Sequence, residues 1–169
     1  MKKQILIIIS IISIFLTSCG IRNSYQNSNK EFSINFPEGW QIIEEAIDSP
    51  IVVTAIKNDD SGTNINIAYL NLNAVTPLKT LVDNNISHLR KNTIDFKMLE
   101  SKYLYIHKLQ GYKIIYSHTS AENTALKVLL YCITSGSRFY VVTCTAPIDT
   151  FDKNVETFNQ TIKSLYIKI

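Results

Sequence analysis

Apolar and polar residues alternate along much of the chain beyond residue 31, and this alternation predicts half-buried β-strands. Phe32, Ile34 and Phe36 show the pattern first. Pro37-Glu38-Gly39 then predicts a turn, and Trp40 opens the next strand. Further strands are predicted over residues 51–57, 65–69, 97–106, 112–118, 125–134 and 138–145.

Two segments instead repeat their apolar residues every three or four positions, as amphipathic helices do. The first covers residues 77–91, where Thr76 is placed to cap the helix and Pro77 takes the first helical position. The second runs from Phe151 to Leu165, with a cap expected near Asp149. Two helices among many strands predict an α+β domain with a mainly antiparallel sheet.

The N-terminus has a different pattern. Lys2 and Lys3 precede an apolar run from Ile5 to Leu16. This run is shorter than the ~20 residues that cross a bilayer as a helix, and it has the length of the apolar region of a signal peptide. It ends in Leu16-Thr17-Ser18-Cys19, which resembles the lipobox of bacterial lipoproteins: an aliphatic residue, two small residues and a cysteine.

The resemblance implies that residues 1–18 are a lipoprotein signal peptide and that Cys19 is the lipid attachment site. Small side chains let the extended backbone enter a signal-peptidase site, and the cysteine thiol takes up diacylglycerol before cleavage. Acyl chains such as palmitate then anchor the mature protein, because a single acyl chain binds a membrane only marginally. The alternative is an ordinary secretory signal that contains a cysteine by chance.

The sequence after the cysteine sets the expected domain boundaries. Residues 19–30 are polar and rich in Asn and Ser, which predicts a flexible, lipidated tether, and residues 31–169 form the folded domain. Gly20 stands where an aspartate would resemble an inner-membrane retention signal. We therefore expect the protein in the bacterial cell envelope, held by lipid at Cys19, at the outer membrane if the host has two membranes.

Three parts of the expected domain resemble the PsbP-like family. The segment from Phe32 to Trp40 contains the family's Phe-Pro-x-Gly-Trp turn, and Arg138 to Thr143 resembles its last hairpin. The segment from Phe151 to Ile169 resembles its C-terminal helix, with Leu165 in the place of the usual phenylalanine. The resemblance implies an α/β/α sandwich around an antiparallel sheet. These matching positions belong to the core, so no functional residue carries over, and nothing indicates a photosystem role.

The net charge of the chain says little about its function. The whole chain carries 17 basic and 14 acidic residues, a net charge of +3. Removal of residues 1–18 takes away two lysines and no acid, which leaves 15 basic against 14 acidic residues. A nearly neutral domain gives no electrostatic reason to expect nucleic acid as a partner.

Motifs for catalysis, cofactors or metals are not found in the sequence. The five glycines are scattered, so no phosphate-binding loop is formed. A calcium loop starting at Asp59 would need a glutamate at its twelfth position, where Leu70 stands. His88, His107 and His118 have no metal-ligand spacing, and we expect them to be surface or hydrogen-bonded histidines. We therefore predict no catalytic, cofactor-binding or metal-binding residue.

Cys132 and Cys144 lie on the two strands of the last hairpin, which Ser135-Gly136-Ser137 connects. If Ser135 pairs with Arg138 around a two-residue turn, Cys132 faces Val141 and Cys144 faces Leu129. The two thiols then lie on opposite faces of the sheet as free, buried cysteines. A three-residue loop would instead bring them onto one face, diagonally, where a disulfide remains an alternative.

Two classes of function remain after these exclusions. The first is a non-enzymatic envelope lipoprotein whose domain binds or scaffolds another envelope protein, with the membrane reached through the lipid anchor. The second is a small-molecule binder or weak hydrolase that uses a cleft between helix and sheet. The core-only motifs favour the first.

Overall fold

A computed structural model describes residues 23–46, 49–60 and 62–169 of this chain. Cys19 and the predicted signal peptide lie outside these described residues. Two α-helices and ten β-strands follow one another as β1 (Asn23–Asn27), β2 (Phe32–Phe36), β3 (Trp40–Glu44), β4 (Ile51–Lys57), β5 (Asn64–Asn71), α1 (Leu78–Asn92), β6 (Ile94–Ile106), β7 (Leu109–Thr119), β8 (Ala125–Ser135), β9 (Arg138–Pro147), α2 (Phe151–Lys163) and β10 (Tyr166–Ile167).

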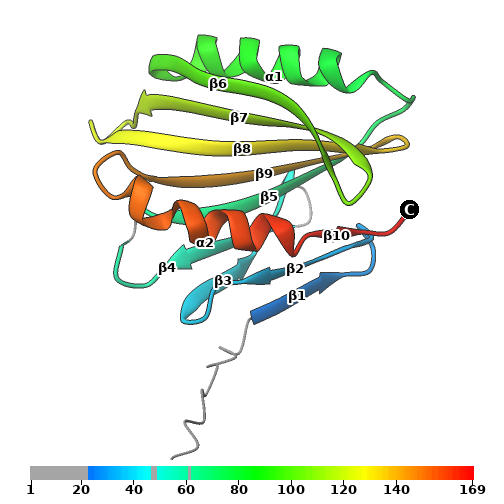
Figure 1. Ribbon diagram of the computed structural model, residues 1–169, viewed down its shortest axis with the longest axis horizontal. Helices are drawn as coiled ribbons and strands as arrows, with labels where there is room; N and C mark the ends of the chain where they lie inside the picture. The colour runs from blue at the N-terminus through cyan, green and yellow to red at the C-terminus, as the bar shows by residue number, and fades with distance from the viewer. Residues whose placement is uncertain (1–22, 47–48, 61) are drawn as a thin grey trace, which may run out of the picture.

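The described strands form two antiparallel sheets (Figure 1). The larger has seven strands in the order β3-β4-β5-β9-β8-β7-β6, so that β3 and β6 are its edges. The smaller joins β1, β2 and β10. Short hairpin connections link most neighbours, which explains why alternation in the sequence located the strands so well.

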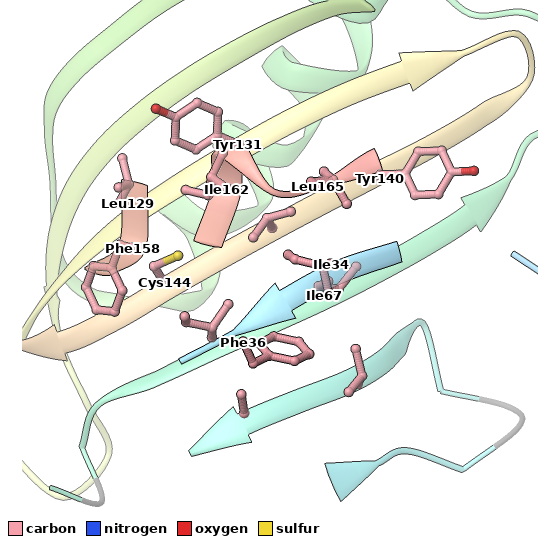
Figure 2. Close-up of a cluster of buried hydrophobic side chains, with 14 of the residues drawn as sticks. Ile34, Phe36, Ile67, Leu129, Tyr131, Tyr140, Cys144, Phe158, Ile162 and Leu165 are labelled. Carbon is pink, nitrogen blue, oxygen red and sulfur yellow. The ribbon is translucent and has the colours of Figure 1, made fainter. Parts of the chain in front are cut away.

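Each face of the larger sheet covers its own apolar core. On one face Ile114, Leu130 and Val141 pack under α1. On the other, residues from β5, β8 and β9 meet α2 and β2, as Figure 2 shows for Ile67, Leu129 and Phe158. Successive residues of β8 and β9 therefore enter different cores, and both strands are buried on both faces.

The predicted α+β class is confirmed, but the arrangement departs from a simple α/β/α sandwich. Helix α1 lies on one face of the larger sheet. Helix α2 shares the other face with the three-stranded sheet, through Phe32, Ile34 and Phe36 of β2. Sheet therefore dominates the fold, because a short second sheet does part of the covering that a sandwich assigns to helices.

The N-terminal part of the domain differs from the prediction. Asn23–Asn27 form β1, paired in register with Phe32–Phe36, so residues 23–30 belong to the folded domain and not to a flexible tether. Tyr25 is only 8% exposed, and its ring lies 5.9 Å from that of Phe32 and 6.3 Å from that of Phe36, between centroids. A strand with one apolar residue in five gives no alternation to detect.

The predicted cap at Thr76 is wrong by one residue, and the cap expected near Asp149 lies at the next residue, Thr150. Pro77 itself occupies the cap position of α1, because its ψ of 131° is extended, and the helix begins at Leu78. The Thr76 hydroxyl donates to the Ala74 carbonyl instead. Before α2 the cap position belongs to Thr150, not Asp149, and its hydroxyl donates to the Pro147 carbonyl.

The last hairpin has the predicted two-residue turn. Ser135 pairs with Arg138, Cys132 faces Val141 and Cys144 faces Leu129. Cys132 lies in the core under α1 and Cys144 in the core under α2, and both thiols are free. The disulfide alternative is therefore wrong, because the sheet itself separates the two sulfur atoms.

Candidate functional site

The three histidines are placed apart. His88 contacts Asn92 on α1, and the His118 ring lies 5.8 Å from that of Tyr116 on β7. His107 lies in the turn between β6 and β7. Within the part of the chain that the structure describes, no three His, Cys, Asp or Glu residues are grouped as metal ligands would be.

The turn between β6 and β7 is unusual in its residues. Ile106 pairs with Leu109, so His107 and Lys108 alone make the turn, with φ of 46° and 73°. Two consecutive residues with positive φ are typical of a two-residue hairpin turn, where Gly, Asn and Asp are the usual residues. The His107 Nε2 atom lies 2.9 Å from the carbonyl oxygen of Lys163, which ties the turn to the last residue of α2.

A pocket of about 310 Å³ lies between this hairpin and α2. Its wall is mostly apolar, with polar groups from Asn159, His107 and Lys163 at its rim; the remaining lining residues are Leu104, Tyr105, Ile106, Tyr131 and Ile162. The pocket is thus a cleft between helix and sheet of the kind that the alternative function requires.

The chemistry of this pocket is limited. Burial raises the pKa of Tyr131, so its hydroxyl stays protonated at neutral pH. His107 already contacts a backbone carbonyl through Nε2. If Nε2 donates to this carbonyl, Nδ1 keeps a free acceptor, but the lining residues include no Ser, Thr, Cys, Asp or Glu that it could activate as a nucleophile. The pocket is therefore suited to holding an apolar ligand more than to catalysing a reaction.

A second cavity, of about 170 Å³, lies where β1, β2 and the C-terminal segment meet. Two of its lining residues, Glu31 and Lys168, contact Arg138 of β9, which lies next to the cavity. Arg138 forms an ion pair with Glu31 and donates to the Lys168 carbonyl at 2.8 Å, while the Tyr140 hydroxyl donates to the Lys30 carbonyl at 2.8 Å. These contacts fasten both ends of the domain to β9, so we assign them a structural role.

Aromatic residues gather on the β6–β7 hairpin beside this pocket, and Tyr105 also lines the pocket. Tyr103 and Tyr105 of β6 and Tyr112 of β7 form what we call the tyrosine surface, with ring centroids 5.4 Å apart for Tyr103–Tyr105 and for Tyr103–Tyr112. Tyr103 is 42% exposed and Tyr105 65%. A hydrogen bond with Tyr105 raises the pKa of Tyr103 to about 12, so this phenol is uncharged at physiological pH.

A shallow hollow of about 380 Å³ lies beside the start of β7. Gln110, which lies opposite Tyr105 in the ladder, lines this hollow together with Val75 and Leu78. Val75 is itself 76% exposed. Large aromatic and aliphatic side chains exposed side by side are a feature of interaction sites, where a partner covers them.

The sequence pattern alone does not predict that the tyrosine surface is exposed. Tyr103 and Tyr105 alternate with Leu104 and Ile106, a pattern that also fits a strand buried on both faces. Only the strand order shows that β6 is an edge and that α1 leaves these rings uncovered. The one available signal was the high tyrosine content of this stretch. Of the predicted sites, Cys19 lies outside the described residues.

Solved structures with this fold come from distant sources. Cyanobacterial PsbP from Synechocystis sp. PCC 6803 matches with a TM-score of 0.70 at 14% identity, over 90% of this chain and 99% of that one. LpqN, described as involved in cell envelope biogenesis of Mycobacterium tuberculosis, matches at 0.61 and 13% identity, over 82% of this chain and 83% of that one. The Ran-binding protein Mog1p of Saccharomyces cerevisiae matches at 0.61 and 9% identity, over 86% and 95%.

These likenesses define a PsbP/Mog1-like fold, as the sequence resemblance implied. The chain belongs to the DcrB family, whose model matches residues 31–164. No curated protein sequence matches the chain. Neither of the helices in the described ranges is long and apolar enough to cross a membrane.

Proposed function

We propose that this protein is an envelope lipoprotein whose domain binds another envelope protein. The location is supported by Leu16-Thr17-Ser18-Cys19, directly after a signal-like apolar run and ahead of a DcrB-family domain. A structural neighbour, LpqN, is described as involved in cell envelope biogenesis, which agrees with an envelope role. In this proposal residues 1–18 are removed and lipid on Cys19 anchors the protein to the membrane.

The binding role rests on the tyrosine surface. Tyrosine rings bury much area at small entropic cost and are enriched where proteins bind one another. The backbone of β6 is less available, because the strand has two bulges and carries Lys97 and Lys102. Both features oppose the addition of a further strand. We therefore propose recognition through the side chains of Tyr103 and Tyr105.

The anchor is tested by metabolic labelling with a fatty acid in the native host. The wild-type protein should carry the label, and Cys19→Ala should carry none and keep its signal peptide, because the thiol is the acceptor. Cys132→Ala is the matched control and should be labelled normally. Label on the Cys19→Ala protein would refute the lipoprotein assignment.

The binding role is tested by a photoreactive amino acid placed at position 105 of the full chain in intact cells. We expect one adduct of defined mass, with no such adduct from the same probe at Glu122, an exposed loop residue. Tyr103→Ser should reduce the adduct severalfold while the thermal melting curve stays unchanged. Equal crosslinking from both probe positions would contradict a specific surface.

The alternative function, a small-molecule binder, is favoured by the pocket between α2 and the β6–β7 hairpin. An apolar ligand there should raise the melting temperature in a screen of amphiphiles, by mass action on the folded state. Ile162→Ala, which enlarges the pocket, should alter that response, whereas Tyr103→Ser, outside the pocket lining, should reduce only the protein adduct. The two functions are thus separable.

A further inference from the structure

The distance between the proposed lipid and the folded domain is short. β1 begins at Asn23, only four residues after Cys19, so three residues lie between the lipidated cysteine and the sheet. Even a fully extended backbone spans at most about 14 Å over four residues. The sequence predicted a tether three times as long, which would have held the domain off the membrane.

The end of the domain that this short link reaches is well defined. Asn23 pairs with Phe36 at the end of β2, and its side-chain amide donates to the Trp40 carbonyl at 3.4 Å. The turn at residues 37–39 and the start of β3 therefore lie beside the beginning of β1 (Figure 1). We call this region the β1–β3 end.

The tyrosine surface lies on the opposite edge. β3 and β6 are the two edges of the seven-stranded sheet, six strand spacings apart. At roughly 4.8 Å per spacing the middle of β6 lies about 29 Å from β3 across the sheet. The β6–β7 turn that follows Tyr105 is nearer to β1, because His107 contacts Lys163 at the end of α2. In Figure 1, α1 and the first part of β6 lie at the top, β1 lies at the bottom, and the β6–β7 turn descends between them toward the end of α2.

We propose that lipid on Cys19 holds the β1–β3 end against the bilayer surface, so that the tyrosine surface is presented away from the membrane. This placement rests on the proposed lipidation of Cys19. The partner that binds the tyrosine surface would then approach from the aqueous side of the membrane, beyond the lipid headgroups. The bilayer is then the direct neighbour of β2 and β3, and the partner approaches β6.

The charges at this end give no electrostatic attraction to anionic lipid, so in this proposal the acyl chains alone provide the attachment. Glu38 is exposed in the turn, and Lys57, which pairs with Trp40 in the ladder, lies 3.8 Å from Asp59. With Asp60 nearby the region carries more acid than base. A basic cluster is what anionic lipid attracts. The placement should therefore be the same with and without anionic lipid.

The single tryptophan of the chain makes the placement measurable, because Trp40 is at the β1–β3 end. Full-length lipidated protein is reconstituted in phosphatidylethanolamine–phosphatidylglycerol vesicles that carry a dansyl group on a fraction of the headgroups. Energy transfer from tryptophan falls with the sixth power of distance. We expect transfer from Trp40 to exceed severalfold that from a Trp40→Phe, Leu99→Trp variant, whose tryptophan is on β6.

A longer link is the matched control. Insertion of about 20 Gly and Ser residues between residues 22 and 23 adds a reach of roughly 25 Å. This insertion should lower transfer from Trp40 toward that of the Leu99→Trp variant, while vesicle binding is retained. Replacing phosphatidylglycerol by phosphatidylcholine should change neither result.

Mass spectrometry of Cys19 in the same samples separates two kinds of failure. Absence of lipid on Cys19 would refute the proposed lipoprotein and this placement with it. Lipid on Cys19, with equal transfer from Trp40 and the Leu99→Trp variant, would refute the placement alone. The same holds if the Gly-Ser insertion leaves Trp40 transfer unchanged.

Discussion

Cys132 and Cys144 illustrate, at the level of single residues, how strand register determines thiol chemistry. Burial raises the pKa of Cys132 to about 12 and also raises that of Cys144. Both thiols therefore stay protonated in the folded domain at physiological pH, and both are fully enclosed by apolar neighbours. Thiolate is the reactive form of cysteine, so both residues act here as small apolar core residues.

The two thiols of a soluble chain of residues 23–169 should react with a thiol reagent only after unfolding. At pH 8 we expect negligible reaction without denaturant and two thiols titrated in guanidinium. Because burial raises the pKa of each thiol in the folded state, the thiols of the unfolded state lose their protons at lower pH. The free energy of unfolding should therefore fall as pH rises from about 9 toward 12. The fall should be up to about 1.4 kcal/mol per pH unit for each thiol. A Cys132→Ala, Cys144→Ala protein should show a shallower slope. The slope that remains should come from buried tyrosines such as Tyr116 and Tyr131, because burial raises their pKa as well. An intramolecular bridge detected by mass would contradict the prediction.

Trp40 is the second residue with a defined energetic role. It is 8% exposed and belongs to the core under α2. Trp40→Ala should lower the free energy of unfolding by roughly 3–5 kcal/mol, because a large cavity is left, and Trp40→Phe should cost much less. Urea melts of the two variants measure both effects. A loss below about 1 kcal/mol for Trp40→Ala would show that the indole contributes little to the core.

At the level of elements, alternation predicted the strands of the larger sheet and the register of its last hairpin, because apolar side chains there must point into one core or the other. It did not predict β1, where Tyr25 is the only core residue of the strand. The cap of α1 was expected at Thr76 and that of α2 near Asp149, one residue before the observed caps at Pro77 and Thr150. The sequence pattern alone does not fix a helix end to a single residue.

Strand β1 should contribute strongly to stability, although its sequence resembles a linker. Tyr25→Ala removes a ring that packs on Phe32 and Phe36, and we expect a loss of about 3 kcal/mol in denaturant melts. Tyr25→Phe keeps the ring and loses only the hydroxyl, which accepts a hydrogen bond from Asn27 at 3.2 Å, so it should cost about 1 kcal/mol or less. Equal melting of both variants and wild type would restore the flexible-tether interpretation.

At the scale of the whole molecule, the same fold serves proteins as different as a cyanobacterial PsbP and a yeast Ran-binding protein, at 14% and 9% identity to this chain. What the three share is the packing of helices on an antiparallel sheet, and function resides in surface residues that the fold does not fix. The core was therefore accessible from the sequence. The tyrosine surface was not, because its exposure depends on strand order and on where α1 ends.

The polar groups in the cleft between helix and sheet determine whether the domain could catalyse a reaction. Catalysis needs preorganised groups in a water-limited cleft. In the cleft that the described residues form between helix and sheet, Tyr131 is held protonated by burial and His107 contacts the Lys163 carbonyl. A soluble chain of residues 23–169 should therefore show no turnover with ester, phosphate, peptide or glycoside substrates and bind no stoichiometric zinc. Substrate panels and metal analysis of the purified domain measure this. Hydrolysis that His107→Ala abolishes, while the domain keeps its melting temperature, would establish the enzyme in place of the binding protein.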